Sequence, residues 1–255
     1  MKHFDEARDL AGLPVVGLQD EYAPVFVDSE HSHSRAQLLY ASSGVMSVVA
    51  GGASFVIPPL RAIWIPSGTR HEVSCRSAVS LRTLYIDEHR TGSGERECRV
   101  VEVSDFLKAL IVELAHIGEG ADGGDIRYQQ IVSLLIAELA AMPTAPYQAP
   151  MPTDPRLLRV CRRILDEPTD RRTLDDYASL AGMGRRTFTR QFRQETGMSL
   201  GIWCQQVRLL DAISRLACGQ SVTTVAFDVG YESPSAFTSM FHRFFGVPPN
   251  QYRFH

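Results

Sequence analysis

Long apolar segments and paired cysteines are both absent from this sequence of 255 residues. No run approaches the ~18–20 apolar residues of a membrane-spanning helix. The polar start, MKHFDEARDL, lacks the apolar core of a signal peptide. The cysteines are odd in number and none belongs to a CxxC pair: Cys75, Cys98, Cys161, Cys204 and Cys218. This disfavours a disulfide framework and a zinc finger, so we expect a cytoplasmic protein without a membrane partner.

Lysine is absent from the last two-fifths of the chain, and arginine takes its place. Residues 154–255 hold 14 arginines and 10 acidic residues, which gives this segment a net charge of +4. The rest of the chain carries −7, so the total of −3 conceals two halves of opposite sign. This asymmetry indicates that only the C-terminal half meets a polyanion.

A proline-rich stretch divides the chain. The segment AMPTAPYQAPMPTDP, residues 141–155, holds five prolines and almost no charge. Such proline density cannot continue a helix and favours an extended spacer. We place a linker at 142–154, between a first domain at 1–141 and a second at 155–255. The length of the chain suits two domains of ordinary size.

The first domain is predicted to contain many short strands followed by two helices. Segments rich in β-branched and aromatic residues, separated by glycine and proline, are typical of a sandwich or jelly-roll barrel. These segments are 36–40, 45–50, 53–57, 62–65, 72–75, 80–86 and 99–103. From Ser104 the apolar residues recur three and four apart, which predicts amphipathic helices over about 104–141. The stripe expected on the second is Ile131, Leu134, Leu135 and Leu139. These helices either cover the barrel or pair with those of a second chain.

The second domain is predicted to contain two helix-turn-helix units. In the first, Thr173 and Asp176 have capping-box spacing, Gly182 and Gly184 bracket a turn, and a second helix follows over 185–195. Its aromatic pair faces inward, and the outward positions are Arg186, Thr189, Arg190 and Arg193. Arginines on such a helix suit DNA phosphates and guanine edges in the major groove.

The same pattern of helix-cap and turn residues recurs about 50 residues later. Ser221 caps one helix, Gly230 marks the turn, and Ser233 caps a second helix that begins with Pro234. Its outward positions are Ser235, Thr238, Ser239 and His242. A longer amphipathic helix within 201–219 joins the two units and would fix their spacing. Helix pairs are common in any small helical domain, but two matching units in a basic domain favour DNA binding.

The segments LAGMGRRTFTRQFRQETGMS and VRLLDAISRLACGQSVTTVAFDVGYESPSAFTSMFHRFFGVPPNQYR resemble the DNA-binding domain of AraC/XylS transcription regulators. The resemblance covers residues 156–253 and implies a seven-helix domain with two recognition helices in successive turns of the major groove. It implies base contacts from Arg186, Thr189 and Arg190, and from Pro234, Ser235, Thr238 and Ser239. Phosphate contacts would include Arg185, Thr187 and Arg193. Pro234 and Ser239 stand where larger polar residues are common, which suggests that the second unit contributes positioning more than base specificity.

Two further motifs lie in the first domain. HSHSRAQLLYASSG reads H-x-H-x₃-Q-x₆-G, and PSGTRH reads P-x-G-x₂-H; together they resemble the cupin motifs. The resemblance implies a cupin β-barrel and a metal-ligand set of His31, His33, Gln37 and His71. Imidazole suits zinc, nickel, iron or copper, and an amide oxygen is a weaker ligand. Val25 and Leu60 replace the leading glycines of the two motifs. Residues 31, 33 and 37 would share a face if they lay on one regular strand.

The expected fold is therefore mixed, an all-β domain followed by an all-α domain. Arg35, Tyr40 and Trp64 are candidates for the lining of the same cavity as the histidines. The favoured function is a DNA-binding regulator that senses a small molecule or a metal; homodimer formation and contact with RNA polymerase are compatible with it. The alternative is a metal-dependent cupin enzyme fused to a DNA-binding tail, but few acid–base candidates beyond Glu72 and Tyr40 lie near the motifs. We therefore expect no catalytic residues.

Overall fold

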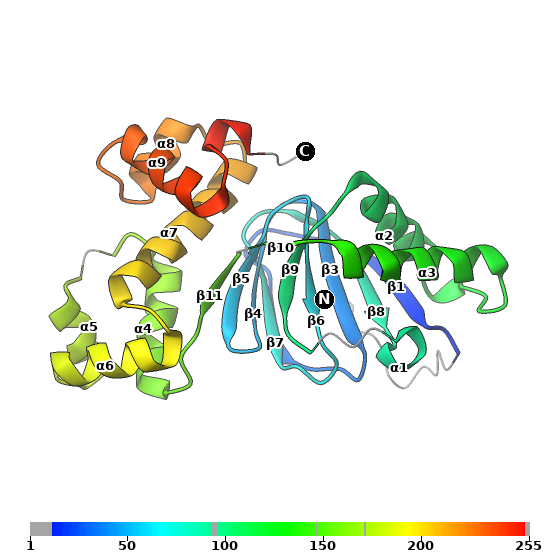
Figure 1. Cartoon of the computed structure of the whole chain (residues 1–255), viewed down its shortest axis with the longest axis horizontal. Coiled ribbons are helices and arrows are strands. Elements are labelled where there is room, and N and C mark those ends of the chain that lie inside the picture. Colours follow the sequence, from blue (N-terminus) through cyan, green and yellow to red (C-terminus); the bar gives the residue numbers. More distant parts are fainter. Residues whose placement is uncertain (1–11, 93–95, 146, 171, 253–255) are drawn as a thin grey trace. The chain divides into compact units, whose positions relative to one another are not determined.

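The computed structural model of the chain describes residues 12–92, 96–145, 147–170 and 172–252. The chain divides into two compact units. The first comprises Ile57–Tyr147 and the described residues up to Gly51, and the second comprises Gly52–Val56 with Gln148–Tyr252. The elements are labelled in Figure 1.

The N-terminal half is built from two antiparallel sheets. In pairing order, the first sheet consists of β1 (Val15–Tyr22), β8 (Val79–Ile86), β3 (Ala36–Ser43), β6 (Arg61–Ile65), β9 (Arg99–Glu102) and β10 (Thr144–Ala145). The second consists of β11 (Gln148–Pro150), β5 (Ala53–Ile57), β4 (Met46–Ala50), β7 (His71–Cys75) and β2 (Val27–His31). The predicted strands are all present, whereas β1, β2, β10 and β11 were not expected.

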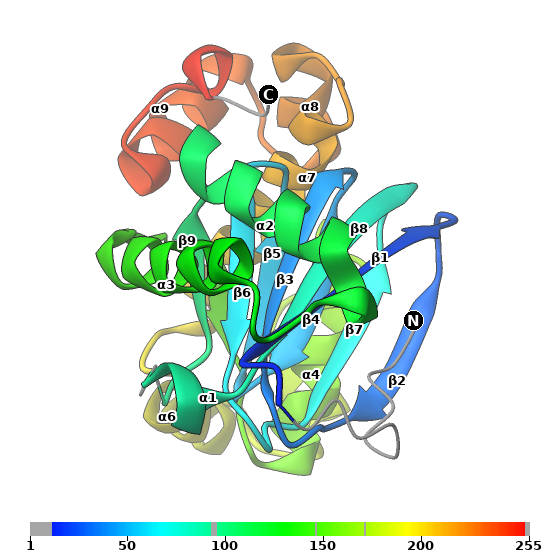
Figure 2. The same cartoon turned by 90° about the vertical axis from the view of Figure 1, so that its right-hand side faces the viewer.

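Two helices cover one face of the first sheet, as Figure 2 shows. They are α2 (Asp105–Ile117), capped by the hydroxyl of Ser104, and α3 (Ile126–Ala141). At Gly17 of β1 a Cβ atom would lie 2.2 Å from the carbonyl oxygen of Leu114, so glycine permits the close approach of α2. The hydroxyl of Tyr128 on α3 donates to the Val15 carbonyl oxygen at 2.5 Å. Two short elements complete this half, α1 (Glu88–Thr91) and a 3₁₀ turn (Gly118–Gly120).

The buried face of α3 differs from the predicted stripe. Leu135 and Leu139 are buried as expected, but Leu134 is 46% exposed. Tyr128 and Val132 take the remaining buried positions. Both Tyr128 and Leu135 belong to the core that α2 and α3 form with the first sheet. The helix is therefore rotated from the predicted phase because Tyr128, absent from the predicted stripe, faces β1.

The C-terminal half is helical. Its described helices are α4 (Pro155–Asp166), α5 (Leu174–Leu180), α6 (Arg185–Thr196), α7 (Leu200–Ala217), α8 (Val222–Asp228) and α9 (Pro234–Phe245). A 3₁₀ turn, Pro249–Gln251, follows α9, so the described part of this half has six α-helices and not the seven that the resemblance implied. The mixed fold class, an all-β part followed by an all-α part, is confirmed. No helix in the described ranges is long and apolar enough to cross a membrane.

The predicted caps and aromatic pairs of both helix-turn-helix units are present. Thr173 and Asp176 form the capping box of α5, and the hydroxyls of Ser221 and Ser233 cap α8 and α9. Four rings are fully buried: Phe188 and Phe192 of α6, and Phe237 and Phe241 of α9. Because these rings fix the rotation of α6 and α9 about their axes, the opposite faces of both helices are turned toward solvent.

Candidate functional site

Three histidine side chains converge at one end of the β-structure. His31 ends β2 and His71 begins β7, and the two residues pair directly across these strands. His33 lies in the connection from β2 to β3. One ring nitrogen of each histidine lies within 4.8 Å of the corresponding atoms of the other two. The expectation that residues 31, 33 and 37 share one strand is wrong, because β2 ends at His31 and Gln37 lies on β3 of the other sheet.

The backbone fixes the tautomer of each imidazole. The Nδ1 atoms of His31, His33 and His71 lie 2.8, 2.7 and 2.9 Å from the carbonyl oxygens of Ser29, Arg35 and Thr69, respectively. A carbonyl oxygen only accepts, so each Nδ1 carries the hydrogen and each Nε2 of a neutral ring carries the lone pair. Histidines that bind metals are commonly oriented in this way by a hydrogen bond from the other ring nitrogen.

His71 is the most buried member of the cluster. Its side chain is fully buried, and its Nε2 atom has no hydrogen-bond partner among the described residues. Burial lowers the pKa of His71 to about 4, so this ring is neutral at pH 7. The carboxylate of Asp28 lies 3.9 Å from Nε2 of His31 and adds negative charge beside the three rings. A buried lone pair near a carboxylate fits a bound cation.

Gln37 faces the cluster from the first sheet. Its Oε1 atom lies 3.0 Å from Nε2 of His33, and its amide nitrogen donates to the hydroxyls of Thr83 and Tyr85 at 3.1 and 3.2 Å. Because Nε2 of neutral His33 and Oε1 of Gln37 are both acceptors, they repel each other unless a cation lies near both or the amide is reversed. The four side chains proposed as ligands therefore do come together.

Thr83 and Tyr85 were not recognised from the sequence. They lie two apart on β8, and Tyr85 pairs with Gln37. The available signal was the presence of two hydroxyl side chains, two residues apart, in the apolar second half of a predicted strand, because buried polar side chains are usually paired. Here they orient the Gln37 amide.

Two of the three proposed pocket residues, Tyr40 and Trp64, lie away from the histidines. Tyr40 and Trp64 belong to the core that the first sheet forms with α2 and α3. Successive residues of a strand face opposite sides, so Tyr40 lies on the face of β3 opposite to Gln37. The guanidinium of Arg35 donates to the carbonyl oxygen of Leu13, which belongs to the same core. The expectation for Tyr40 and Trp64 is wrong because that face of the sheet is covered by helices.

The two missing motif glycines lie at unusual backbone positions. Val25 has φ of 68° and Leu60 has φ of 61°, and they are the non-glycine residues with positive φ in the described part of the chain. Glycine adopts this left-handed region without steric cost. At both positions the backbone therefore adopts the conformation that the motif glycine would favour, although this chain has valine and leucine there.

The candidate DNA interface of the first helix-turn-helix unit is the exposed face of α6. Arg185, Arg186, Thr187, Thr189, Arg190 and Arg193 are all exposed. Asp175 holds the guanidinium of Arg185 at 3.1 Å, and the hydroxyl of Thr189 donates to the Arg185 carbonyl oxygen. Arg186, Arg190 and Arg193 have no carboxylate partner among the described residues. Three unneutralised guanidinium groups on one helix face favour a nucleic-acid partner.

The corresponding face of α9 carries little charge. Ser235, Ser239 and His242 are exposed, whereas Pro234 and Thr238 are partly buried. The hydroxyls can donate to phosphate or base edges, but this face has no exposed arginine at the predicted reading positions. The structure thus brings each set of predicted DNA contacts onto the solvent face of one helix.

Comparison with known proteins gives the family. A model of AraC-like ligand-binding domains matches residues 14–142, and a model of a helix-turn-helix domain matches residues 177–254. This chain belongs to the AraC family. It is a DNA-binding transcriptional regulator with a ligand-sensing domain.

Several AraC-family proteins resemble the chain along most of its length. It is 27% identical over 222 residues to the transcriptional regulator NimR of Escherichia coli K12, covering 87% of this chain and 81% of that protein. It is 22% identical over 242 residues to the activator RhaS of Escherichia fergusonii, covering 88% and 87%. Both are named as regulators of transcription.

Two solved structures are also similar to this chain. Fatty-acid-bound ToxT of Vibrio cholerae covers 93% of this chain and 94% of its own, with 12% identity and a TM-score of 0.41. The DNA-binding domain of AdpA, solved with target DNA, is 34% identical; it covers 39% of this chain and 90% of its own, with a TM-score of 0.36.

Proposed function

We propose that the ligand-sensing domain of this AraC-family regulator binds one divalent transition metal through His31, His33 and His71. The observation that carries the proposal is the common orientation of the three rings, since each Nδ1 is anchored to a carbonyl oxygen and each Nε2 lone pair faces the cluster. Gln37 is the fourth candidate ligand through Oε1.

The donor set narrows the choice of metal. Three imidazoles and an amide oxygen suit zinc, nickel, iron or copper better than calcium or magnesium. A bound ion supplies a Lewis-acidic point at which an effector bearing oxygen or nitrogen can bind. The residues of the chain hold the ring tautomers, exclude bulk water from His71 and orient the Gln37 amide.

DNA binding is assigned to α6 and α9. In this proposal Arg186, Thr189 and Arg190 contact bases, and Arg185, Thr187 and Arg193 contact phosphates. Pro234, Ser235, Thr238, Ser239 and His242 of α9 contribute mainly to positioning. In this proposal the metal serves sensing and not catalysis, which is supported by relatives that are named as regulators of transcription. RNA polymerase is a further proposed partner, and the protein is proposed to act in the cytoplasm.

A homodimer is the proposed assembly. Apolar side chains on α2 and α3 remain exposed, among them Phe106 at 49%, Ile126 at 70% and Leu134 at 46%. Exposed apolar groups on neighbouring helices favour burial against another surface. A second copy with the same helices would supply such a surface and would double the DNA sites.

Metal content tests the central part of this proposal. Protein purified without a histidine tag is expected to contain one equivalent of metal by mass spectrometry. His31→Ala should lose it, whereas His89→Ala, a substitution of an exposed histidine on α1, should retain it. Metal bound equally by both variants, or absent from the unaltered protein after reconstitution with each of the four metals, would contradict the proposal.

A further inference from the structure

The segment that leads into the DNA-binding helices is paired as a strand. β11 runs antiparallel to β5, with Gln148 opposite Phe55 and Pro150 opposite Ala53. The amide of Met151 donates to the Gly52 carbonyl oxygen at 2.7 Å, and Ala149 is fully buried. The proline-rich sequence is therefore extended as predicted, but it is held by hydrogen bonds and is not a loose spacer.

Helix α7 holds the other edge of β11. The indole nitrogen of Trp203 donates to the Pro150 carbonyl oxygen at 2.6 Å, and the amide of Gln206 donates to the Gln148 carbonyl oxygen at 2.6 Å. Residues 148 and 150 are two apart, so their carbonyl groups point to the same side of the strand. β11 is thus bound by β5 on one edge and by α7 on the other.

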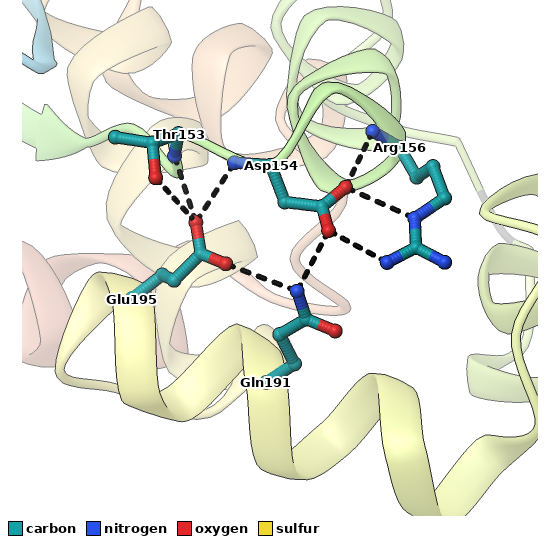
Figure 3. Close-up of polar contacts among 5 residues, drawn as sticks. All are labelled: Thr153, Asp154, Arg156, Gln191 and Glu195. Atoms are coloured by element: carbon teal, nitrogen blue, oxygen red, sulfur yellow. Dashed lines mark hydrogen bonds and ion pairs between the residues drawn. The ribbon is translucent and has the colours of Figure 1, made fainter.

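The end of this segment is held by the first recognition helix, as Figure 3 shows. Oε2 of Glu195 accepts from the amide of Thr153 at 2.8 Å, from its hydroxyl at 3.1 Å and from the amide of Asp154 at 2.9 Å. The amide of Gln191 donates to Asp154 Oδ2 at 2.7 Å and to Glu195 Oε1 at 3.2 Å. Asp154 in turn caps α4 by accepting from the Arg156 amide at 2.8 Å.

Glu195 and Gln191 share α6 with the exposed arginines. They lie four residues apart, one helical turn, and both are partly buried, whereas Arg190 and Arg193 are exposed. These donors, the amide of Asp154 first, keep the pKa of Glu195 below its ordinary value. Charge-assisted hydrogen bonds of this kind are among the stronger ones in proteins. A shift of residues 153–154 against α6 therefore breaks three such bonds or carries the helix with it.

Most of β5, the strand that pairs with β11, belongs to a different compact unit from the parts of the chain on either side of it. Residues Gly52–Val56 belong to the second compact unit, whereas Gly51 and Ile57 on either side belong to the first. The chain thus crosses between the units at both ends of this strand and again between Tyr147 and Gln148. All three of these covalent connections lie within or directly beside the β5–β11 pair.

We propose that Glu195 is a positioning residue that couples the β5–β11 pair to the first recognition helix. Through its bonds to Thr153 and Asp154, it makes the placement of α6 on DNA depend on the state of the strand pair. The proposal rests on the DNA-binding function of the family and does not depend on the metal. Coupling between two sites is reciprocal, so DNA bound at α6 must also stabilise the strand pair.

Hydrogen exchange of the full chain tests this coupling in the presence of a metal chelator. The probe is a double-stranded DNA that the chain selects from a random pool. In the unaltered protein, DNA should slow exchange in α6 and also, by about fivefold or more, at residues 52–56 and 148–151. In Glu195→Ala the protection of α6 should remain while the protection of the strand pair is lost.

Three variants keep the test decisive. Glu195→Gln retains an amide oxygen as acceptor and should restore the effect at the strand pair in part. Gln194→Ala, at an exposed neighbouring position, should behave as the unaltered protein. Thr153→Ala removes only the hydroxyl donor and should weaken the effect, so this variant replaces Glu195→Ala in the test if Glu195→Ala does not fold.

Coupling would be refuted if DNA left exchange at 52–56 and 148–151 unchanged in the unaltered protein. The role of Glu195 would be refuted if that effect persisted in Glu195→Ala, or if DNA no longer protected α6 in the folded Glu195→Gln protein.

Discussion

Replacing His71 by leucine should separate packing from metal binding. In the metal-free protein the buried, unpartnered Nε2 atom destabilises the folded state by about 1–3 kcal/mol, and the substitution removes this penalty. It also removes the hydrogen bond from Nδ1 to the Thr69 carbonyl oxygen, which contributes about 1 kcal/mol. The two effects oppose each other, so we expect the free energy of unfolding of the metal-free variant to remain within about 2 kcal/mol of the original.

The metal-bound state should respond differently. A ligand present at 100 times its Kd stabilises the folded protein by about 2.7 kcal/mol. For a domain of this size that corresponds to a rise in Tm of roughly 5–10 °C. Thermal unfolding with zinc and with a chelator should show this rise in the unaltered protein and none in His71→Leu. An equal rise in both proteins would refute the assignment of His71 as a ligand, and a large loss of stability in chelator would show that its role is packing.

Five other substitutions test DNA contact, backbone strain and dimer formation. Arg190→Ala should reduce the free energy of DNA binding by about 1–3 kcal/mol through one base position. Arg193→Ala should weaken binding to all sequences and reduce by about one the slope of log affinity against log salt concentration. Affinities for operator variants at several salt concentrations distinguish the two. Val25→Gly should raise the free energy of unfolding by about 0.5–1 kcal/mol, because Val25 is 84% exposed and has positive φ. Val27→Gly, at the start of β2, should lower it, and a denaturant titration that ranks the two variants otherwise would contradict the presence of backbone strain at Val25. Leu134→Glu should convert a dimer to a monomer in light scattering at micromolar concentration, and an unaltered protein that is already monomeric would remove the dimer proposal.

Local sequence signals predicted most of the secondary structure. The caps at Ser104, Thr173, Ser221 and Ser233 begin helices because their hydroxyls accept from backbone amides one turn ahead. The buried strands were recognisable from runs of β-branched and aromatic residues. In contrast, β2 (VDSEH) has a polar sequence and an exposed face, and so lacked that signal.

The candidate metal ligands could be named from motif spacing, but their arrangement could not. His31 and Gln37 belong to different sheets, and only the tertiary fold brings them together. The rotation of α3 was mispredicted because the contact of Tyr128 with Val15 spans 113 positions in the sequence. The hydrogen bonds of Glu195 to Thr153 and Asp154 likewise join residues about 40 apart, and no local pattern reveals them.

The most direct test of the central claim is the DNA affinity of the full chain with and without metal. The measurement uses fluorescence anisotropy with selected DNA, first in chelator and then with the metal found in the purified protein. We expect a change in Kd of about 5–150-fold in the unaltered protein, the usual range for coupled sites, and no change in His71→Leu. Equal affinity of the unaltered protein in both conditions would contradict a metal-responsive regulator.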